Sequence, residues 1–219
     1  MMYLSNPEKL MKLLTQLWGG LGNTLYLFFA TLILSLPLGL AAALLRRSRK
    51  IALRAPVSFY IIIMRGTPLI LQIFAIYFTI PLLVGHAFDR MAATVIAFVL
   101  NYAAYFAEIF RGGIDTIARS QWEAGTALGM NRAQVFVKVV LPQVLRNVIL
   151  PVSNEVITLV KDTALVTAVG IVDLYRAAKN AASSSGSLEP LFIAGLVYLL
   201  LNTVVTWGFS ELHKRAALP

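Results

Sequence analysis

Long uncharged runs, most of them apolar, alternate with short charged segments along this chain. A helix needs about 20 predominantly apolar residues to cross a bilayer. One run holds 33 uncharged residues between Lys12 and Arg46, and the last holds 21 between Glu189 and Glu211. The pattern predicts an all-α membrane protein with about five transmembrane helices. The expected spans cover residues 21–45, 56–83, 91–110, 148–169 and 188–209.

The first 20 residues differ from the spans, because charged and apolar positions are mixed there. Leucines recur with helical spacing, while Lys9 and Lys12 lie elsewhere on the turn. Such a pattern is typical of a helix that lies in the membrane surface. We expect residues 1–20 to form an N-terminal interfacial segment and residues 21–215 to form a single transmembrane domain.

The composition agrees with a membrane location. Of the 219 residues, 58% are hydrophobic and 13% are charged, and the mean hydropathy is +0.76. Soluble domains average about 45–50% apolar and about 25% charged residues. A chain this apolar could not cover a water-facing surface, so lipid must surround much of it.

The basic residues predict how the chain is oriented. The net charge of +9 arises from 19 Lys and Arg against 10 Asp and Glu. An excess of Lys and Arg marks the cytoplasmic loops of membrane proteins. If the first span ends in the cytoplasm, twelve basic residues lie inside and five outside, with Arg65 and Lys161 within spans. We therefore expect the N-terminus outside and the C-terminus in the cytoplasm.

The residue inventory argues against several kinds of chemistry. There is no cysteine, and His86 and His213 are isolated, so we expect no metal site. The chain has no G-x-x-x-x-G-K-S/T phosphate loop, so it would need a partner to bind ATP. No nucleophile–base constellation stands out, so we expect neither enzyme activity nor a cofactor.

Residues 112–147 form the longest cytoplasmic segment in this arrangement. The pattern predicts a helix from Gln121, a break at Gly129, and a second helix that ends before Pro142. Several apolar side chains lie within it, which a solvated linker would not need. A loop folded with exposed Leu, Met and Trp usually meets another protein or packs back on its own bundle.

The spacing within this loop resembles the EAA loop of ABC-importer permeases. That loop has a Glu-Ala-Ala triplet and a Gly four residues beyond its last Ala, and it ends with an Ile-x-Leu-Pro motif. The corresponding positions here are Glu123, Ala124, Gly125, Gly129, Val139, Leu141 and Pro142. Gly125 stands where the family has its last Ala, and Val139 where it has Ile.

Further motifs resemble the polar amino-acid (histidine/glutamine-type) branch of the same family, so the resemblance extends over about residues 20–215. These motifs are Arg65–Gly66–Thr67–Pro68, Asn101–x3–Tyr105–x2–Glu108, Gln121–Trp122–Glu123 and Lys161–Asp162–Thr163–Ala164–Leu165.

The resemblance implies a type I ABC-importer permease that moves a polar or charged amino acid into the cytoplasm. In that family two permease subunits pair in the bacterial cytoplasmic (inner) membrane. A cytoplasmic ATPase dimer drives transport, an extracytoplasmic solute-binding protein delivers the substrate, and each EAA helix sits in a cleft of the ATPase. The implied ATPase-coupling residues are Glu123, Ala124, Gly125, Gly129, Leu141 and Pro142. Without the resemblance, Glu123 would read as a solvated loop carboxylate.

Charged residues within the fourth expected span are unusual, because charges at membrane depth are costly and usually face a pathway or a partner. On a helix, Glu155, Thr158 and Asp162 share one side, and Lys161 lies on an adjacent stripe. Glu155 falls about 10 Å from the cytoplasmic start of this span, which places it toward the membrane midplane. It could bind a substrate ammonium group or pair internally with Arg65 or Lys161. For Lys161 and Asp162 a structural or gating role is favoured.

The second and third spans add polar candidates. Gly66 and Pro68 would interrupt the second span, and backbone groups freed at such a break can hold a substrate. Asn101 and Tyr105 stack one turn apart in the third span. The candidate substrate-binding residues are Glu155, Asn101, Arg65, Thr67, Tyr105, Thr158 and Lys161, with Tyr102 a weaker candidate.

An ion-coupled secondary amino-acid transporter is the alternative, in which Glu155 and Asp162 would carry protons or sodium. Five spans do not divide into two halves, and the sequence shows no internal repeat of the kind common in such transporters. The sequence leaves open which amino acid is carried and whether the second permease is an identical chain or a paralogue.

Overall fold

The computed structural model describes residue 3, residues 6–86 and residues 89–217. The α-helices are α1 (Pro7–Arg46), α2 (Ile51–Gly66), α3 (Leu69–Phe74), α4 (Ile80–Val84), α5 (Arg90–Asp115), α6 (Arg119–Ala127), α7 (Arg132–Val135), α8 (Leu141–Asp162), α9 (Leu174–Ser185) and α10 (Glu189–Ala217). Two π-helical turns, Ala75–Thr79 and Phe136–Val140, join α3 to α4 and α7 to α8, and a 3₁₀ segment, Thr163–Val169, follows α8. The described residues contain no strand.

Four helical stretches are long and apolar enough to cross a membrane: α1, α5, the continuous stretch Arg132–Val169, and α10. The helix α2 and the stretch Leu69–Leu83 pass the same test as a pair, which bends by 113° at the break between them. With this pair counted as one span, the predicted all-α architecture of about five spans is confirmed.

The N-terminal segment differs from its prediction as a separate surface helix. From Pro7 onward it belongs to α1, which runs for 40 residues without a break; residues 1–2 and 4–5 lie outside the described residues. The physical reason lies in packing. Leu13 and Leu17 are buried against α9 and α10, so contact with protein accounts for these two apolar positions, while Leu14 and Trp18 stay exposed.

The cytoplasmic loop also differs at one boundary. Its second short helix does not end before Pro142 but continues through the π-helical turn Phe136–Val140 into α8. A proline is tolerated in the first turn of a helix, where its missing N–H would have no partner. Pro142 occupies that position in α8, so it does not stop the chain from continuing as a helix.

A seam of small side chains lets α1 pack closely along its length. The small or polar residues buried in it are Gly20, Thr24, Thr31, Ser35, Gly39 and Ala43. Small residues allow helix backbones to approach each other, which favours association in lipid. A Cβ atom at Gly39 would lie 2.6 Å from Cβ of Phe106 in α5, and one at Gly20 would lie 2.5 Å from the carbonyl oxygen of Asp173. The seam therefore fits α1 to α5 at one end and to the start of α9 at the other.

Ion pairs join the C-terminal end of α1 to the last two turns of α5. Arg46 pairs with Glu108, and Arg47 pairs with Asp115. The C-terminal ends of these two helices therefore lie on the same side of the molecule.

At the opposite end, Asp173 ties α9 to α10. Its fully buried carboxylate caps α9 by accepting hydrogen bonds from the backbone N–H groups of Tyr175 (3.1 Å) and Arg176 (3.0 Å). The hydroxyl group of Tyr198 in α10 also donates to it (3.3 Å). Burial raises the pKa of Asp173, although the hydrogen bonds that it accepts act in the opposite direction.

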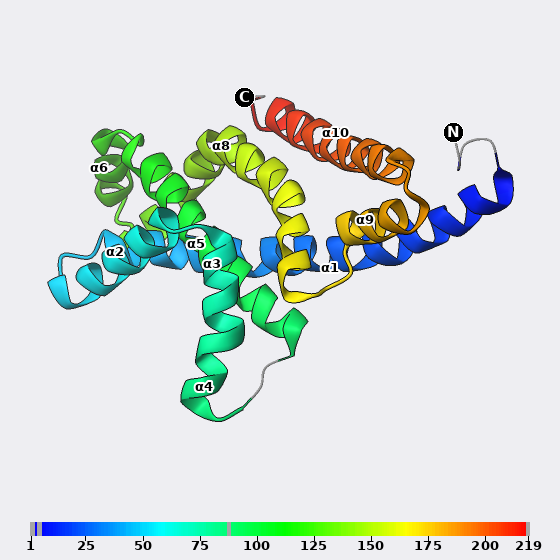
Figure 1. Cartoon of the computed structure of the whole chain (residues 1–219). Coiled ribbons are helices and arrows are strands. Elements are labelled where there is room, and N and C mark those ends of the chain that lie inside the picture. Colours follow the sequence, from blue (N-terminus) through cyan, green and yellow to red (C-terminus); the bar gives the residue numbers. More distant parts are fainter. Residues whose placement is uncertain (1–2, 4–5, 87–88, 218–219) are drawn as a thin grey trace.

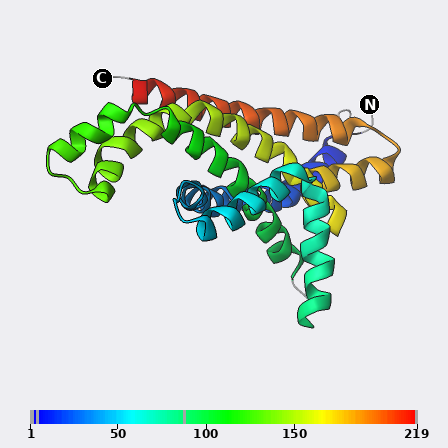
Figure 2. The ribbon, with the colours of Figure 1, turned by 90° about the vertical axis from the view of Figure 1, so that its left-hand side faces the viewer.

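The helices form a flattened bundle with two projections. α8 and α10 lie side by side along one edge, while α1 lies across the bundle (Figure 1, Figure 2). The hairpin of α6 and α7 projects at one end, and the arm of α3 and α4 points away from the bundle (Figure 1, Figure 2).

Replacing Gly39 by alanine is expected to destabilise the protein, because the added methyl group would overlap Phe106 and force α1 away from α5. Overpacking costs typically about 1–3 kcal/mol, and each kcal/mol lowers the melting temperature by roughly 2–4 °C in a chain of this size. Gly22→Ala is the matched control, since Gly22 lies on the same helix with nothing within 4 Å of its Cβ position. Thermal unfolding of the purified protein in detergent measures both; equal melting temperatures would show that the seam tolerates the extra group.

Candidate functional site

The break between α2 and α3 is encoded by Arg65–Gly66–Thr67–Pro68. Pro68 has no backbone N–H, and its ring disfavours helical geometry at the preceding residue. Thr67 accordingly lies in the extended region (φ −121°, ψ 147°), and the helix restarts at Leu69. Carbonyl groups at the end of α2 thereby lose their helical partners, and within a membrane span lipid would offer none.

Two amide side chains replace the missing partners. Gln72 Nε2 donates to the carbonyl oxygens of Met64 (2.9 Å) and Thr67 (3.1 Å) and lies 2.8 Å from Thr67 Oγ1. Asn101 Nδ2, from α5, donates to the same Met64 carbonyl (3.0 Å) and to Gln72 Oε1 (3.0 Å). Both amide side chains are buried. The bent pair is therefore held in shape by its own Gln72 and by α5.

A cavity of about 420 Å³ lies between the break, α5 and α8. Small-molecule pockets measure roughly 300–1,000 Å³, so the space suits a ligand of amino-acid size. Its lining residues are Thr67, Pro68, Leu69, Asn101, Tyr102, Tyr105, Glu155, Thr158, Asp162 and Leu165. Five of the seven candidates chosen from the sequence are therefore brought together: Thr67, Asn101, Tyr105, Glu155 and Thr158.

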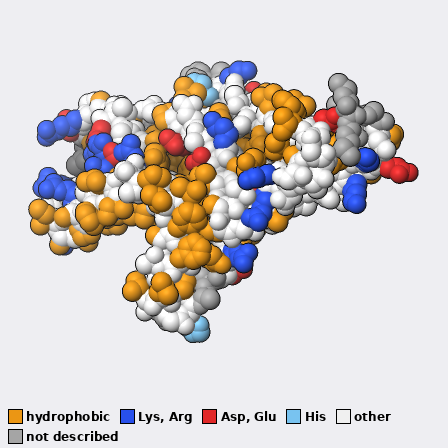
Figure 3. Space-filling view, viewed as in Figure 1, with side chains coloured by type: hydrophobic (Ala, Val, Ile, Leu, Met, Phe, Trp, Pro, Cys, Tyr) orange, Lys and Arg blue, Asp and Glu red, His pale blue; other side chains and the backbone are white. Residues whose placement is uncertain are grey.

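The two carboxylates of the cavity differ in their partners. Asp162 accepts a hydrogen bond from the hydroxyl group of Tyr102 (2.8 Å). Among the described residues, no Lys or Arg nitrogen lies within 4 Å of the Glu155 carboxylate, so neither ion pair considered for it is formed. Acidic side chains near the middle of the face in Figure 3 are bordered by hydrophobic surface. A half-buried carboxylate without a cation is costly, so Glu155 favours a positively charged ligand.

Arg65 and Lys161, the other two candidates, do not line the cavity. The guanidinium group of Arg65 lies over the ring of Tyr105, 5.3 Å from its centroid, and its Nη1 atom is 3.7 Å from Glu108 Oε2. Lys161 is exposed on the neighbouring stripe of α8. Arg65 therefore borders the cavity only through Tyr105.

The turn of the α6–α7 hairpin is specified by its local sequence. Gly129 ends α6 with a φ of +78°, a left-handed conformation that glycine adopts without steric cost. Asn131 then caps α7 through a reciprocal pair of hydrogen bonds with Gln134. Gly125 lies so close to Val135 that a Cβ atom there would be 2.8 Å from Val135 Cγ2. Glycine at position 125 thus permits the close packing of α6 on α7.

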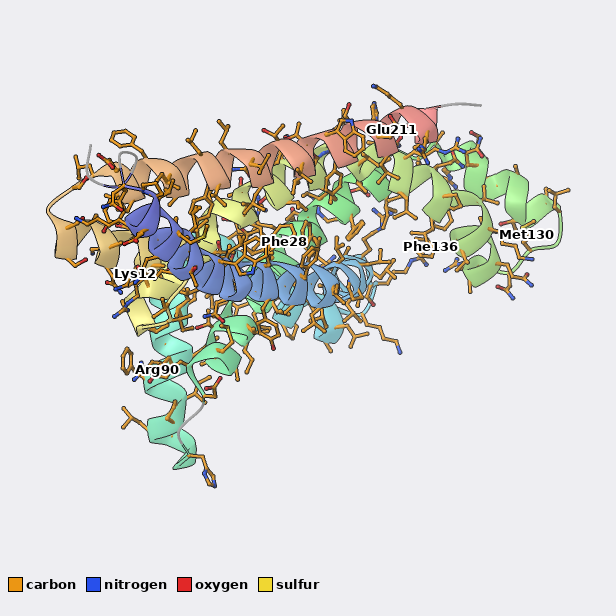
Figure 4. The ribbon with its side chains drawn as sticks, turned by 90° about the vertical axis from the view of Figure 1, so that its right-hand side faces the viewer. Lys12, Phe28, Arg90, Met130, Phe136 and Glu211 are labelled. Carbon is orange, nitrogen blue, oxygen red and sulfur yellow. The ribbon has the colours of Figure 1, made fainter. Side chains whose placement is uncertain are left out.

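The hairpin packs three of its apolar side chains, Trp122, Met130 and Phe136, partly against the core and exposes Leu128. Trp122 stacks on Phe136 with ring centroids 6.3 Å apart, and Met130 and Phe136 lie in the projecting end of the molecule (Figure 4). Leu128 is 77% exposed. The hairpin is therefore folded on its own while leaving apolar surface for contact with another molecule.

Comparison with known proteins assigns the chain to a family. Residues 35–217 match the family described as the binding-protein-dependent transport system inner membrane component. The chain belongs to this family. The arginine transport system permease protein ArtQ of Bacillus subtilis (strain 168) is 40% identical over 197 residues, which cover 90% of each chain. The octopine transport system permease protein OccM of Rhizobium radiobacter is 37% identical over 217 residues, 95% of this chain and 89% of that protein.

A solved structure supports the same assignment. It is described as an amino acid ABC transporter with histidines, and it superposes with a TM-score of 0.86 at 31% identity, covering 97% of this chain and 98% of that one. The prediction of an ABC-importer permease is therefore confirmed. Membership makes the chain a multi-pass membrane subunit and not an enzyme, and it implies an ATPase and a substrate-binding protein as partners.

The sequence reasoning missed Gln72, on which the shape of the permease's broken span depends. Gln72 is the single amide in the apolar run of residues 69–83, and this signal could have identified it. It also ranked Tyr102 and Asp162 below the main candidates, although both line the cavity and are joined by a hydrogen bond.

Replacing Gln72 by leucine is expected to destabilise the permease, because the carbonyl oxygens of Met64 and Thr67 would lose a buried donor. An unsatisfied buried polar group costs about 1–3 kcal/mol. Leu71→Ala, at the neighbouring exposed position, is the control and should melt close to the parent protein. The melting temperatures of the two purified variants measure the difference. A Gln72→Leu variant as stable as the parent would show that these bonds are not needed to hold the bend.

Proposed function

We propose that the permease carries a polar or charged amino acid into the cytoplasm by way of the cavity beside its broken helix. The observation that carries the proposal is Glu155, a carboxylate with no basic partner among the described residues, on the wall of a cavity of amino-acid size. The ammonium group of an amino acid would supply the missing positive charge. The relatives are named as arginine, octopine, glutamine and cystine transport proteins, which supports this class of substrate.

The other lining residues suit the remaining parts of such a substrate. The hydroxyl groups of Thr67 and Thr158 are short polar groups, and the rings of Tyr102 and Tyr105 give the cavity flat apolar walls. Asn101 shapes the wall through its bonds to the break, rather than offering both amide hydrogens to a ligand. The cavity thus combines two carboxylates, of which Asp162 is already hydrogen-bonded to Tyr102, with neutral groups, and small-molecule sites commonly place a few polar groups in this way.

The proposed orientation places the ion pairs at the ends of α1 and α5 in the cytoplasm, with the N-terminus and α9 outside. The excess of Lys and Arg near Arg46 and Arg47 supports it. Lys and Arg side chains also gather at the end of the molecule where α2 and α6 lie (Figure 3). The α6–α7 hairpin is then cytoplasmic, where we propose that it docks on the ATPase dimer, which binds the ATP.

We also propose that a second permease subunit, identical or paralogous, covers part of the apolar surface. The arm of α3 and α4 exposes large side chains, with Phe78 at 54%, Leu82 at 84% and Leu83 at 80% of their full accessibility. Because this arm stands away from its own bundle, lipid or another subunit must cover it.

Glu155→Gln is expected to weaken substrate binding, since it keeps the shape of the side chain while removing its charge. Charge-assisted hydrogen bonds contribute about 1.5–3 kcal/mol, so the affinity should fall by roughly tenfold or more. The loss should be larger for L-arginine than for L-glutamine, because a second positive group could also reach the site. Equilibrium binding of the two radiolabelled amino acids to the purified permease–ATPase complex measures this.

Glu211→Gln is the control for this experiment, because that carboxylate pairs with Arg215 on α10 and does not line the cavity. Unchanged affinity in Glu155→Gln, together with a lowered melting temperature, would show that Glu155 has a structural role and would remove it from the substrate site.

The turn at Gly129 yields a separate prediction about docking. Gly129→Val is expected to abolish association with the ATPase while leaving membrane insertion intact, because a β-branched residue resists the left-handed conformation there. Asparagine tolerates that conformation better, so Gly129→Asn should retain association. Co-purification of the ATPase with each variant measures the effect. Normal association of Gly129→Val would contradict the proposed role of the hairpin.

A further inference from the structure

One carboxylate, Glu108, lies among three guanidinium groups near the ends of α1, α2 and α5. Arg46 pairs with it, Arg111 Nη2 lies 3.1 Å from its Oε2 atom, and Arg65 Nη1 lies 3.7 Å from the same atom. The Glu108 side chain is only 16% exposed, while the Arg65 side chain is 43% exposed, so Glu108 is the buried member of this pair. Glu108 is therefore the centre of the contact between these three helices.

Arg65 stands between this centre and the substrate cavity. Its guanidinium group is held by Glu108 on one side and by the face of the Tyr105 ring on the other. The Tyr105 ring lines the same cavity as Glu155, so Arg65 lies at the edge of that cavity, although it forms no ion pair with Glu155. Arg65 therefore lies near two carboxylates, Glu108 and Glu155, and it pairs with Glu108.

We propose that Glu108 is a positioning residue, which keeps Arg65 away from Glu155 and so leaves Glu155 free for the positive group of the substrate. The inference rests on the function proposed for Glu155. Arginine has a long, flexible side chain and keeps its charge in proteins. Without the Glu108 charge, Arg65 would be repelled by Arg46 and Arg111 and attracted by Glu155. It would then occupy the place of the substrate's ammonium group.

Asp115 offers a matched control within the same network. It lies two turns beyond Glu108 on α5 and pairs with Arg47 and with Arg111 (2.9 Å), but it makes no ion pair with Arg65. Neutralising Asp115 therefore removes a comparable set of contacts without releasing Arg65.

The test compares Glu108→Gln with Asp115→Asn by equilibrium binding of radiolabelled L-arginine to the purified permease–ATPase complex. Binding is measured without the solute-binding protein, whose own affinity would dominate transport kinetics. Glu108→Gln should weaken binding by about fivefold or more, the usual size of coupling between sites, while Asp115→Asn should stay close to the parent. Adding Arg65→Gln to Glu108→Gln should restore affinity, because the competing cation is then gone.

Three binding results would each overturn the proposal: unchanged affinity in Glu108→Gln, an equal loss in Asp115→Asn, or a further loss when Arg65→Gln is added. The last would mean that Arg65 itself contacts the substrate. A thermal double-mutant cycle on Arg65 and Glu108 tests the pair without any substrate, and additive melting temperatures would also overturn the proposal. Glu155→Gln alone could leave binding unchanged while the cycle shows coupling between Arg65 and Glu108. That result would reject Glu155 as a substrate-binding residue and would leave the pairing of Arg65 with Glu108 intact.

Discussion

A backbone polar group inside a bilayer must find its partner within the protein, and the structure around the break follows from that constraint. Pro68 forces Thr67 out of helical geometry, and the carbonyl groups set free at the end of α2 need donors from elsewhere in the protein. Gln72 and Asn101 supply the donors, and the second of them lies on a different helix. The hydrogen bonds that stabilise the bend therefore also join the bent pair of helices to α5. The cavity lies at this junction, with backbone and side chains from both elements in its wall.

The charged side chains are distributed as the same constraint demands. Toward the ends of the helices, Glu108 and Asp115 each have more than one arginine partner. On α8, Asp162 at the C-terminal end of the helix is bonded to Tyr102, and Glu155 alone of these carboxylates lacks a partner in the described part of the chain. Stability would favour pairing or removing such a group. Its retention on the wall of a cavity is therefore more easily understood through ligand binding than through folding.

The sequence predicted the features that depend on local pattern. Long apolar runs gave the spans, Pro68 gave the position of the break, and Gly129 gave the turn between the loop helices, because each follows from a property of a few adjacent residues. Packing between distant residues was not predictable in this way. The burial of Leu13 and Leu17 against α9 and α10 depends on where those helices lie. The pairing of Arg65 with Glu108 likewise joins residues from two helices whose register no local pattern specifies.

The uninterrupted passage from the loop into α8 gives the permease a mechanical element. The stretch Arg132–Val169 is helical throughout, from the hairpin past Glu155, although a π-helical turn and Pro151 disturb its regular hydrogen bonding. α10 packs along α8 at one edge of the bundle (Figure 2). The hairpin and the cavity wall therefore belong to one continuous helical backbone, so that a displacement of one can reach the other without a relay of side chains between separate elements.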